Sequence, residues 1–191
     1  MARKVGLTIE DVTRAAVEIA DAQGLAAVTI GSVAARLGIR SPSLYAHVAG
    51  LDEVRRLVAL HAAGAMAAAL REATGERAGL EAVRELAFAY RRFAEGYPGR
   101  YAAAQRAVRP GEDDELYRAL AAAAMPAIEA LAQAGVGAGD LVHLARALRA
   151  ALHGFVALEQ AGGFGMPESV DESFARLVEV LLAGVRAAVP T

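Results

Sequence analysis

The segment from Thr29 to Val48, TIGSVAARLGIRSPSLYAHV, constrains the fold more than any other part of the chain. Its pattern predicts two short helices separated by a tight turn, because apolar residues recur at helical spacing on either side of Gly38. Gly38 follows the last periodic residue of the first helix, where a left-handed C-terminal cap is favoured. Thr29 is a suitable N-cap for the first helix, and Ser41 for the second, with Pro42 in its first turn. Two helices joined in this way form a helix-turn-helix.

The second helix of this pair carries the residues best suited to contact nucleic acid. In a helix-turn-helix that binds DNA, the N-terminal part of the second helix contacts base edges in the major groove. The side chains that we expect to be exposed there are mostly hydrogen-bond donors. We therefore predict a DNA-binding surface made of Thr29, Arg40, Ser41, Pro42, Ser43, Tyr45 and His47.

The roles of single residues within this surface stay open at this point. Arg40 is able to bond guanine O6 and N7, the commonest specific contact, but an ordinary surface arginine fits the sequence equally well. Tyr45 and His47 are better placed to contact phosphates than bases, and His47 could instead close the turn as a partly buried histidine. Arg3 and Lys4 fit a solvated terminus better than a DNA-binding arm.

Charge adds little to the argument for DNA binding. The formal net charge of the chain is -2, so any DNA-binding charge must be local. Residues 1–50 hold five basic side chains (Arg3, Lys4, Arg14, Arg36, Arg40) and four acidic ones (Glu10, Asp11, Glu18, Asp21), a net of +1. Because few cations face the DNA, the affinity should depend only weakly on salt.

The whole chain is expected to be all-α, with about nine helices. About a quarter of its residues are alanine, which favours helix, and no segment alternates apolar and polar residues as a strand does. We predict a DNA-binding domain over residues 1–50 and a helical domain for ligand binding and dimerisation over residues 51–191. Outside the helix-turn-helix, the expected helices span about residues 8–23, 51–74, 80–96, 100–108, 112–134 (kinked at Pro126), 140–161 and 171–188, and Asp140 is expected to cap the helix that follows it.

Several other classes of protein are disfavoured. The chain has no cysteine, which removes disulfides, thiolate nucleophiles and most zinc sites. No sequence motif of a metalloprotease, P-loop or serine hydrolase occurs, and His143 and His153 lie about 280° apart around one helix, so they make a poor metal pair. We therefore expect no catalytic residue, metal or cofactor. We also expect no signal peptide, because no apolar run follows the basic residues of MARKVGLTIED, and no membrane span, which places the protein in the cytoplasm.

The stretch Gly24–Val48 resembles the TetR family of bacterial transcriptional repressors. Ser41–Val48, SPSLYAHV, matches the family's recognition-helix signature, which reads Leu-Tyr-x-His followed by Phe or Val. The likeness covers roughly the first 60 residues. It departs at Leu51, where the family usually carries a lysine that meets a phosphate. Arg55 or Arg56 is a candidate to replace it.

A second likeness lies in the C-terminal half. Leu152-His153-Gly154, followed by the glycine-rich segment 162–165, resembles the TetR C-terminal subtype named for a Trp-His-Gly triplet, with leucine in place of tryptophan. The resemblance implies a homodimer that binds a palindromic double-stranded DNA operator. It further implies that the last two helices pair across a two-fold axis, and that a small molecule bound inside each subunit releases the DNA.

The sequence supplies candidates for both C-terminal roles. Both C-terminal helices are apolar on more than one side, as expected if each has more than one neighbour. We predict a dimer interface made of Leu148, Leu152, Phe155, Phe174, Leu177, Val178, Leu181 and Val185. We predict ligand contacts from aromatic or polar side chains on apolar helices, although plain core packing explains each of them as well: Phe88, Tyr90, Tyr97, Tyr101, Tyr117, Met125, His143 and His153. A helical module that binds protein and not DNA is the rival function, and the hydrogen-bond donors after Gly38 argue against it.

Overall fold

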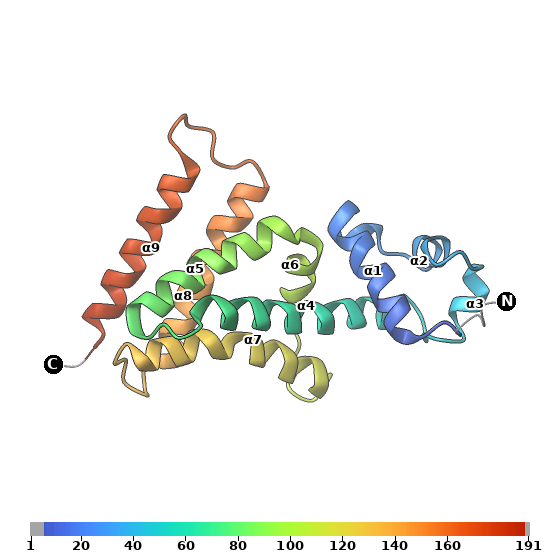
Figure 1. Ribbon diagram of the computed structural model, residues 1–191, viewed down its shortest axis with the longest axis horizontal. Coiled ribbons are helices and arrows are strands. Elements are labelled where there is room, and N and C mark those ends of the chain that lie inside the picture. The colour runs from blue at the N-terminus through green and yellow to red at the C-terminus, as the bar shows by residue number, and fades with distance from the viewer. Residues whose placement is uncertain (1–5, 190–191) are drawn as a thin grey trace. The chain divides into compact units, whose positions relative to one another are not determined.

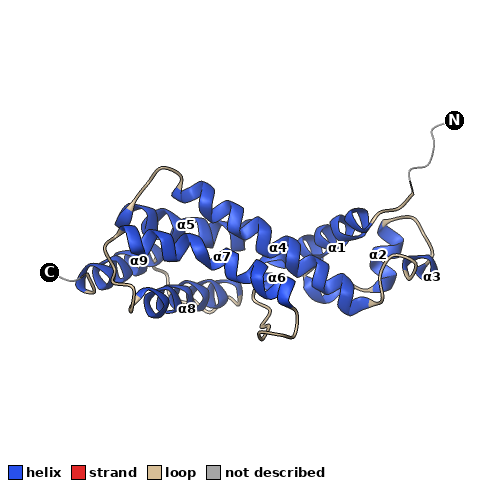
Figure 2. Cartoon of the chain, turned by 90° about the horizontal axis from the view of Figure 1, so that it is seen from below, coloured by secondary structure: helices blue, strands red, loops and turns tan. Residues whose placement is uncertain are grey.

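Helices account for the whole regular structure of the chain over residues 6–189, which are the residues that the structure describes. In this computed structural model (Figure 1) those residues form nine α-helices and one 3-10 helix, and Figure 2 shows no strand among them. The all-α prediction is confirmed. The elements are α1 (Ile9–Gln23), η1 (Leu25–Ala27), α2 (Ile30–Arg36), α3 (Ser41–Leu44), α4 (Leu51–Thr74), α5 (Gly79–Gly96), α6 (Pro98–Ala104), α7 (Asp114–Gln133), α8 (Leu141–Gln160) and α9 (Val170–Ala187).

The chain divides into two compact units. Unit 1 comprises Met1–Met66 and Gly96–Leu120, and unit 2 comprises Ala67–Glu95 and Ala121–Thr191. Helices α4 and α7 therefore contribute residues to both units. A functional boundary near residue 51 stays a prediction, because compactness groups α6 and the start of α7 with the helix-turn-helix.

Unit 1 is organised around α1. Thr8 caps this helix in a capping box, in which its side chain accepts from the Asp11 N–H and the Asp11 carboxylate accepts from the Thr8 N–H. Helix α1 packs against α2, η1 and α6. The apolar core of the unit consists of side chains at most 3% exposed, among them Val12, Ala16, Ile19, Val28, Val33, Leu44, Val54 and Val58.

Unit 2 is built from α5, α8, α9 and parts of α4 and α7. Helices α8 and α9 pack on one another as a hairpin (Figure 1). Its buried side chains include Val83, Leu86, Leu131, Leu148, Leu152, Phe174, Val178 and Leu182. Ser169 caps α9 by accepting from the Glu172 N–H. Asp140 precedes α8, but its side chain makes no capping hydrogen bond, so the predicted role of this carboxylate is wrong.

Several predicted helix ends were also wrong, among them the end of α6, which lies at Ala104 and not near residue 108. Pro98 begins α6, whereas we expected Tyr97-Pro98-Gly99 to precede it; proline suits the first turn of a helix because the N–H it lacks has no partner there. We expected the second helix of the helix-turn-helix to end only at Gly50, but α3 ends at Leu44, and residues 45–47 form a turn. Its N-cap is Arg40, so Ser41 is the first helical residue, and no side chain caps it.

Candidate nucleic-acid interface

The turn between α2 and α3 is fixed by local hydrogen bonds. Gly38 has φ of 68°, its N–H donates to the Ala35 carbonyl, and the Ile39 N–H donates to the Ala34 carbonyl over 3.0 Å. This is the pattern of a Schellman cap, which requires a left-handed residue at that point, as the sequence predicted. The position of α3 relative to α2 therefore follows from residues that are adjacent in sequence.

Thr29 uses its hydroxyl to begin α2. The hydroxyl accepts from the Ser32 N–H over 3.0 Å, and the Ser32 hydroxyl accepts from the Thr29 N–H over 2.9 Å. The Ser32 hydroxyl also donates to the Ala27 carbonyl, which ties η1 to α2. The predicted capping role of Thr29 is confirmed, while its contact with DNA stays a prediction.

Residues 40–47 separate into a buried side and an exposed side. Leu44 is fully buried and, together with Val48, anchors the segment in unit 1. The Tyr45 side chain is 57% exposed, so its ring and hydroxyl are free to meet a ligand. The other predicted contact residues lie on the accessible side as well: Arg40, Pro42 and Ser43 are exposed, and Ser41 and His47 are half-buried.

Arg40 differs from its basic neighbours because it has no acidic partner. Arg14 is paired with Asp11, and Arg36 is paired with Glu18 of α1. Among the basic side chains that the structure describes before α4, Arg40 alone forms no ion pair. Arg3 and Lys4 lie outside the described residues. The unpaired positive charge of this surface therefore sits at the start of α3.

The two candidates for a phosphate contact at the start of α4 differ in their ion pairs. The Glu53 carboxylate accepts from the Ala49 N–H and so caps the helix. Arg56 is bound to two carboxylates, donating to Asp113 and, over 2.6 Å, to Glu115. These hydrogen bonds raise the pKa of Arg56 and hold its guanidinium toward the start of α7. Arg56 is therefore occupied, and Arg55, which forms no ion pair with a described acidic residue, is the remaining candidate.

A contact between α1 and α6 was missed in the sequence analysis. This contact holds α6 against α1, the helix on which α2 also packs. The Asp21 carboxylate accepts from the Arg100 N–H over 2.9 Å and from the Arg100 Nε over 2.7 Å. It thereby caps α6, which lacks a side-chain cap of its own. The Arg100 guanidinium lies 3.6 Å from the centroid of the Tyr97 ring. The only signal in the sequence was an acidic residue near the C-terminal end of α1, where the helix dipole disfavours it.

Comparisons with known proteins identify the family. Residues 83–181 match the family model described as Tetracyclin repressor-like, C-terminal domain. Over 185 residues the chain is 35% identical to the uncharacterized HTH-type transcriptional regulator Rv0681 of Mycobacterium tuberculosis, covering 97% of this chain and 84% of that protein. The chain belongs to the TetR family. It is a helix-turn-helix transcriptional regulator and not an enzyme.

Two further relatives extend the comparison. The uncharacterized HTH-type regulator YobS of Bacillus subtilis is 29% identical over 97% of this chain and 96% of its own length. A TetR variant from Acinetobacter baumannii, solved in complex with minocycline, shares the fold with a TM-score of 0.68 at 23% identity, over 97% of this chain and 100% of that one. The family model that matches is not specific to the Trp-His-Gly subtype.

The predicted ligand contacts of this TetR-family chain fall in both units. In unit 2, Tyr90 is buried, and Phe88 packs edge-on against Phe174 with 5.5 Å between ring centroids. Among the remaining unit 2 candidates, Met125 and His143 are exposed and His153 is half-buried. In unit 1, Tyr101 is buried, while Tyr97 and Tyr117 are more than 40% exposed. No ligand contact by these residues is tested, and all eight stay predictions.

The predicted dimer residues are largely covered within the TetR-family subunit itself. Five of them, Leu148, Leu152, Phe174, Val178 and Val185, are at most 4% exposed, and Phe155, Leu177 and Leu181 are half-buried. Side chains already buried inside a subunit add little area to an interface. Other apolar side chains of the two helices lie on the surface, namely Val142, Leu158 and Val180, which are 47%, 52% and 68% exposed.

Helix α8 is apolar, yet most of its residues are not buried within the subunit. By length and composition alone it is able to span a membrane, and only 17% of its most apolar window is buried. The expectation that no segment reaches such apolar character was too strict. Core helices of soluble proteins pass the same test, and so does a helix that pairs with another subunit.

Proposed function

We propose that this TetR-family chain is a repressor that binds a palindromic operator as a homodimer and leaves it when a small molecule binds. One observation carries the DNA-binding part of the proposal. The segment Arg40–His47 of a helix-turn-helix exposes hydrogen-bond donors around an arginine that has no acidic partner. An unpaired arginine at the start of a recognition helix suits contact with guanine.

Each residue of this surface has a proposed role. Arg40 contacts a base edge, and Ser43 contacts a base or a phosphate beside it. Tyr45 and His47 bind phosphates and so position the protein without selecting sequence. Thr29, Ser41 and Pro42 fix the backbone conformation at the starts of α2 and α3, and so the position of residues 40–47 in the major groove. Arg55 takes the phosphate contact that Leu51 does not make.

The homodimer places two such surfaces on one DNA duplex. A two-fold dimer presents recognition helices about 34 Å apart, one helical turn of DNA, which requires a palindromic site. We propose that the exposed faces of α8 and α9 form the contact, with Phe155, Leu177 and Leu181 at its edge. The exposed apolar or small residues of this face are Val142, Ala147, Ala150, Leu158, Val180, Ala183 and Gly184, with the half-buried Gly154 among them and the exposed His143, Arg146 and Arg176 between them. The exposed apolar side chains support the assignment.

The effector site is proposed for unit 2. Tyr90 of α5 and His153 of α8 each lie one helical turn from small alanine side chains (Ala87 and Ala94, and Ala150 and Ala157), which supports a site for an apolar ligand. The minocycline complex of an A. baumannii relative supports a small-molecule effector as a class. The triplet Leu152-His153-Gly154 supports placement near the Trp-His-Gly subtype. A regulator that acts on chromosomal DNA belongs in the cytoplasm.

Selection of bound fragments from random DNA, followed by affinity measurement, tests this function. We expect the selected site to be palindromic, and Arg40→Ala to lose about 1 to 3 kcal/mol of binding free energy and to relax preference at one base pair. Tyr45→Phe should weaken binding to all sequences alike. Arg92→Ala, an exposed arginine of α5, is the control and should bind as the wild type does. Failure to enrich any DNA would favour a protein-binding helical module instead.

A further inference from the structure

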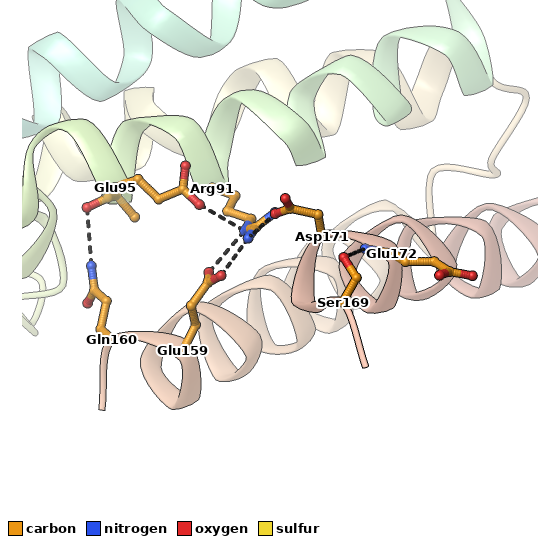
Figure 3. Close-up of polar contacts among 8 residues, drawn as sticks. Arg91, Glu95, Glu159, Gln160, Ser169, Asp171 and Glu172 are labelled. Carbon is orange, nitrogen blue, oxygen red and sulfur yellow. Dashed lines mark hydrogen bonds and ion pairs between the residues drawn. The ribbon is translucent and has the colours of Figure 1, made fainter. Parts of the chain in front are cut away.

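A single arginine joins three segments of unit 2. Arg91 of α5 donates from Nε to Glu159 in the last turn of α8 over 2.9 Å. Its Nη2 donates to Glu159 as well and to Asp171 in the first turn of α9 over 2.7 Å. Glu95, one turn further along α5, lies 3.0 Å from Nε. Figure 3 shows these carboxylates converging on the guanidinium. The hydrogen bonds to Glu159 and Asp171 raise the pKa of Arg91, so it keeps its charge.

Aromatic rings cover the same arginine. Its guanidinium carbon lies 5.0 Å from the ring centroid of Phe174 and 5.9 Å from that of Phe155. These two rings, from α9 and α8, meet at 5.1 Å in an edge-on arrangement. Phe164, from the connection between the two helices, lies 4.7 Å from Phe155. The Arg91 side chain is only 12% exposed. Because the guanidinium is mostly buried and bound to carboxylates of α5, α8 and α9, it restrains the positions of these helices relative to one another.

The connection between α8 and α9 needs such a restraint. Its first part, Gly162-Gly163-Phe164-Gly165, contains three glycines, which by themselves allow many backbone conformations. A further contact lies beside the cluster, where the Gln160 side-chain amide donates to the Ala94 carbonyl of α5 over 3.1 Å (Figure 3). The end of α8 and the start of α9 are therefore both hydrogen-bonded to α5, in addition to their contacts with each other.

We propose that Arg91 is a positioning residue for assembly, which fixes the angle of the α8–α9 hairpin so that its exposed face pairs with a second copy of this chain. The inference rests on the homodimer of the proposed function. A two-fold interface is self-complementary, so both helices must present their faces at one fixed angle. Rotation of α9 about the glycine-rich connection separates Val180 from the α8 side chains that share its face. Arg91 prevents that rotation without itself touching the partner.

A second ion pair between α5 and α9 provides a matched control. Arg84 is paired with Glu179 of α9 and with Glu81 of its own helix. Its side chain is 31% exposed, and that of Glu179 is 53% exposed. Exposed ion pairs contribute little because water screens them. Arg84→Met therefore removes a charge and a contact between the same two helices without disturbing the cluster around Arg91.

The experiment measures the dimer dissociation constant and the hairpin geometry together. The chain has no cysteine, so Ala138→Cys in the turn before α8 and Arg186→Cys near the end of α9 allow two spin labels to be placed at exposed sites outside the proposed interface. Labelled chains diluted in an excess of unlabelled chain report the distance within one subunit by double electron–electron resonance. We expect a narrow distribution for the wild type and for Arg84→Met, with dimer dissociation constants within twofold of each other.

Arg91→Met should broaden the distance distribution and weaken the dimer at least tenfold. Arg91→Lys should recover only part of the loss, because an ammonium group cannot bond Glu159 and Asp171 as a planar fork does. Should Arg91→Met fail to fold, Glu159→Gln decides, since this carboxylate is only 22% exposed and accepts two hydrogen bonds from Arg91, and its loss leaves Arg91 bound to Asp171 and Glu95. We expect it to weaken the dimer about threefold and to broaden the distribution.

Two outcomes have different meanings. A narrow distribution and an unchanged dissociation constant in the variants would overturn the role of Arg91 and leave the homodimer standing. A wild-type chain that stays monomeric at every concentration would instead overturn the homodimer of the proposed function.

Discussion

Gly99 is the residue at which a single methyl group should matter most. A Cβ at this position would lie 2.1 Å from both the carbonyl carbon and the carbonyl oxygen of Ala20, so the backbones of α6 and α1 would have to separate. Overpacking of this kind costs about 1 to 3 kcal/mol, and we expect Gly99→Ala to lower the free energy of unfolding by about that amount. Urea denaturation followed by circular dichroism measures it.

The control for this variant is Gly64→Ala in α4. No atom lies within 4 Å of a Cβ there, and the residue is exposed. Because alanine is the better helix former, this change should raise stability by about 0.5 to 1 kcal/mol. If both variants shifted the urea midpoint in the same direction, the close contact at Gly99 would not exist.

Asp21 should contribute to stability through α6 as well as through its own helix. Its carboxylate accepts two hydrogen bonds from Arg100, one of them from the charged guanidinium, and both side chains are about 20% exposed. A hydrogen bond to a charged group contributes about 1.5 to 3 kcal/mol, so Asp21→Ala should lose about 2 kcal/mol. Thermal unfolding measures the loss. Glu168→Ala, in an exposed loop, should change stability by less than about 0.5 kcal/mol, and an equal effect of both would remove the capping role.

At this scale the sequence predicted contacts that are local. The roles of Thr29 and Gly38 follow from neighbours within five residues, so their caps could be predicted. The partner of Asp21 lies 79 residues away, and nothing in the pattern around either residue indicates the other. The sequence made Arg40 a candidate for DNA contact, but it could not show which arginines form ion pairs. In the structure Glu18 pairs with Arg36, and Arg40 has no ion pair with a described acidic residue.

At the scale of elements, the ion pair between α4 and the start of α7 predicts a pH dependence. The hydrogen bond from Arg56, followed by that from the Leu116 N–H, lowers the pKa of Asp113 to about 2. A carboxyl whose pKa is lower in the folded state stabilises the fold above its unfolded pKa of about 3.9, and loses that contribution as the pH falls toward 2. The stability difference between wild type and Asp113→Asn should therefore shrink between pH 4 and pH 2.

Urea midpoints recorded across that range test the element-level prediction. Asp140→Asn is the matched control, because the Asp140 side chain makes no capping hydrogen bond at α8. Its stability difference from the wild type should not follow the same pH course. A difference for Asp113→Asn that stayed constant from pH 5 to pH 2 would mean that Arg56 does not hold this carboxylate in solution.

The spacing of apolar residues predicted which segments are helical. The residue at which each helix begins or ends depended on local capping groups and on nearby buried side chains. Helix α4 has the predicted bounds because Gly50 and Gly75 flank it. Helix α3 is shorter than predicted, since its apolar anchors Leu44 and Val48 hold the segment whether or not residues 45–47 stay helical. Asp140 has the residue type of an N-cap but not the backbone conformation, with φ of -100° and ψ of -14°.

At the scale of the whole molecule, the spacing of apolar residues showed that α8 and α9 are apolar on several sides. It could not show which neighbouring element covers each of those sides. The strongest stripe, which includes Leu148, Leu152, Phe174 and Val178, is the one the subunit buries for itself. The weaker face, rich in alanine and glycine, is the one that we propose for a second subunit. The most hydrophobic face of a helix therefore indicates the core of the subunit. Candidate interface residues are the apolar side chains that stay exposed after the subunit has folded.

A charge placed on the exposed face of α9 should prevent pairing of two subunits. Val180 of α9 is 68% exposed in the subunit, so Val180→Glu should leave the fold intact. In a two-fold interface each substituted residue lies near its own copy or against apolar atoms, and like charges brought together in this way cost several kcal/mol. We expect the variant to be monomeric at concentrations where the wild type is dimeric, with affinity for a full palindrome reduced to that for a half-site. Analytical ultracentrifugation and operator titration measure both, and Ala68→Glu at an exposed position of α4 should remain dimeric. A Val180→Glu protein that stayed dimeric and bound the palindrome normally would move the interface away from α9.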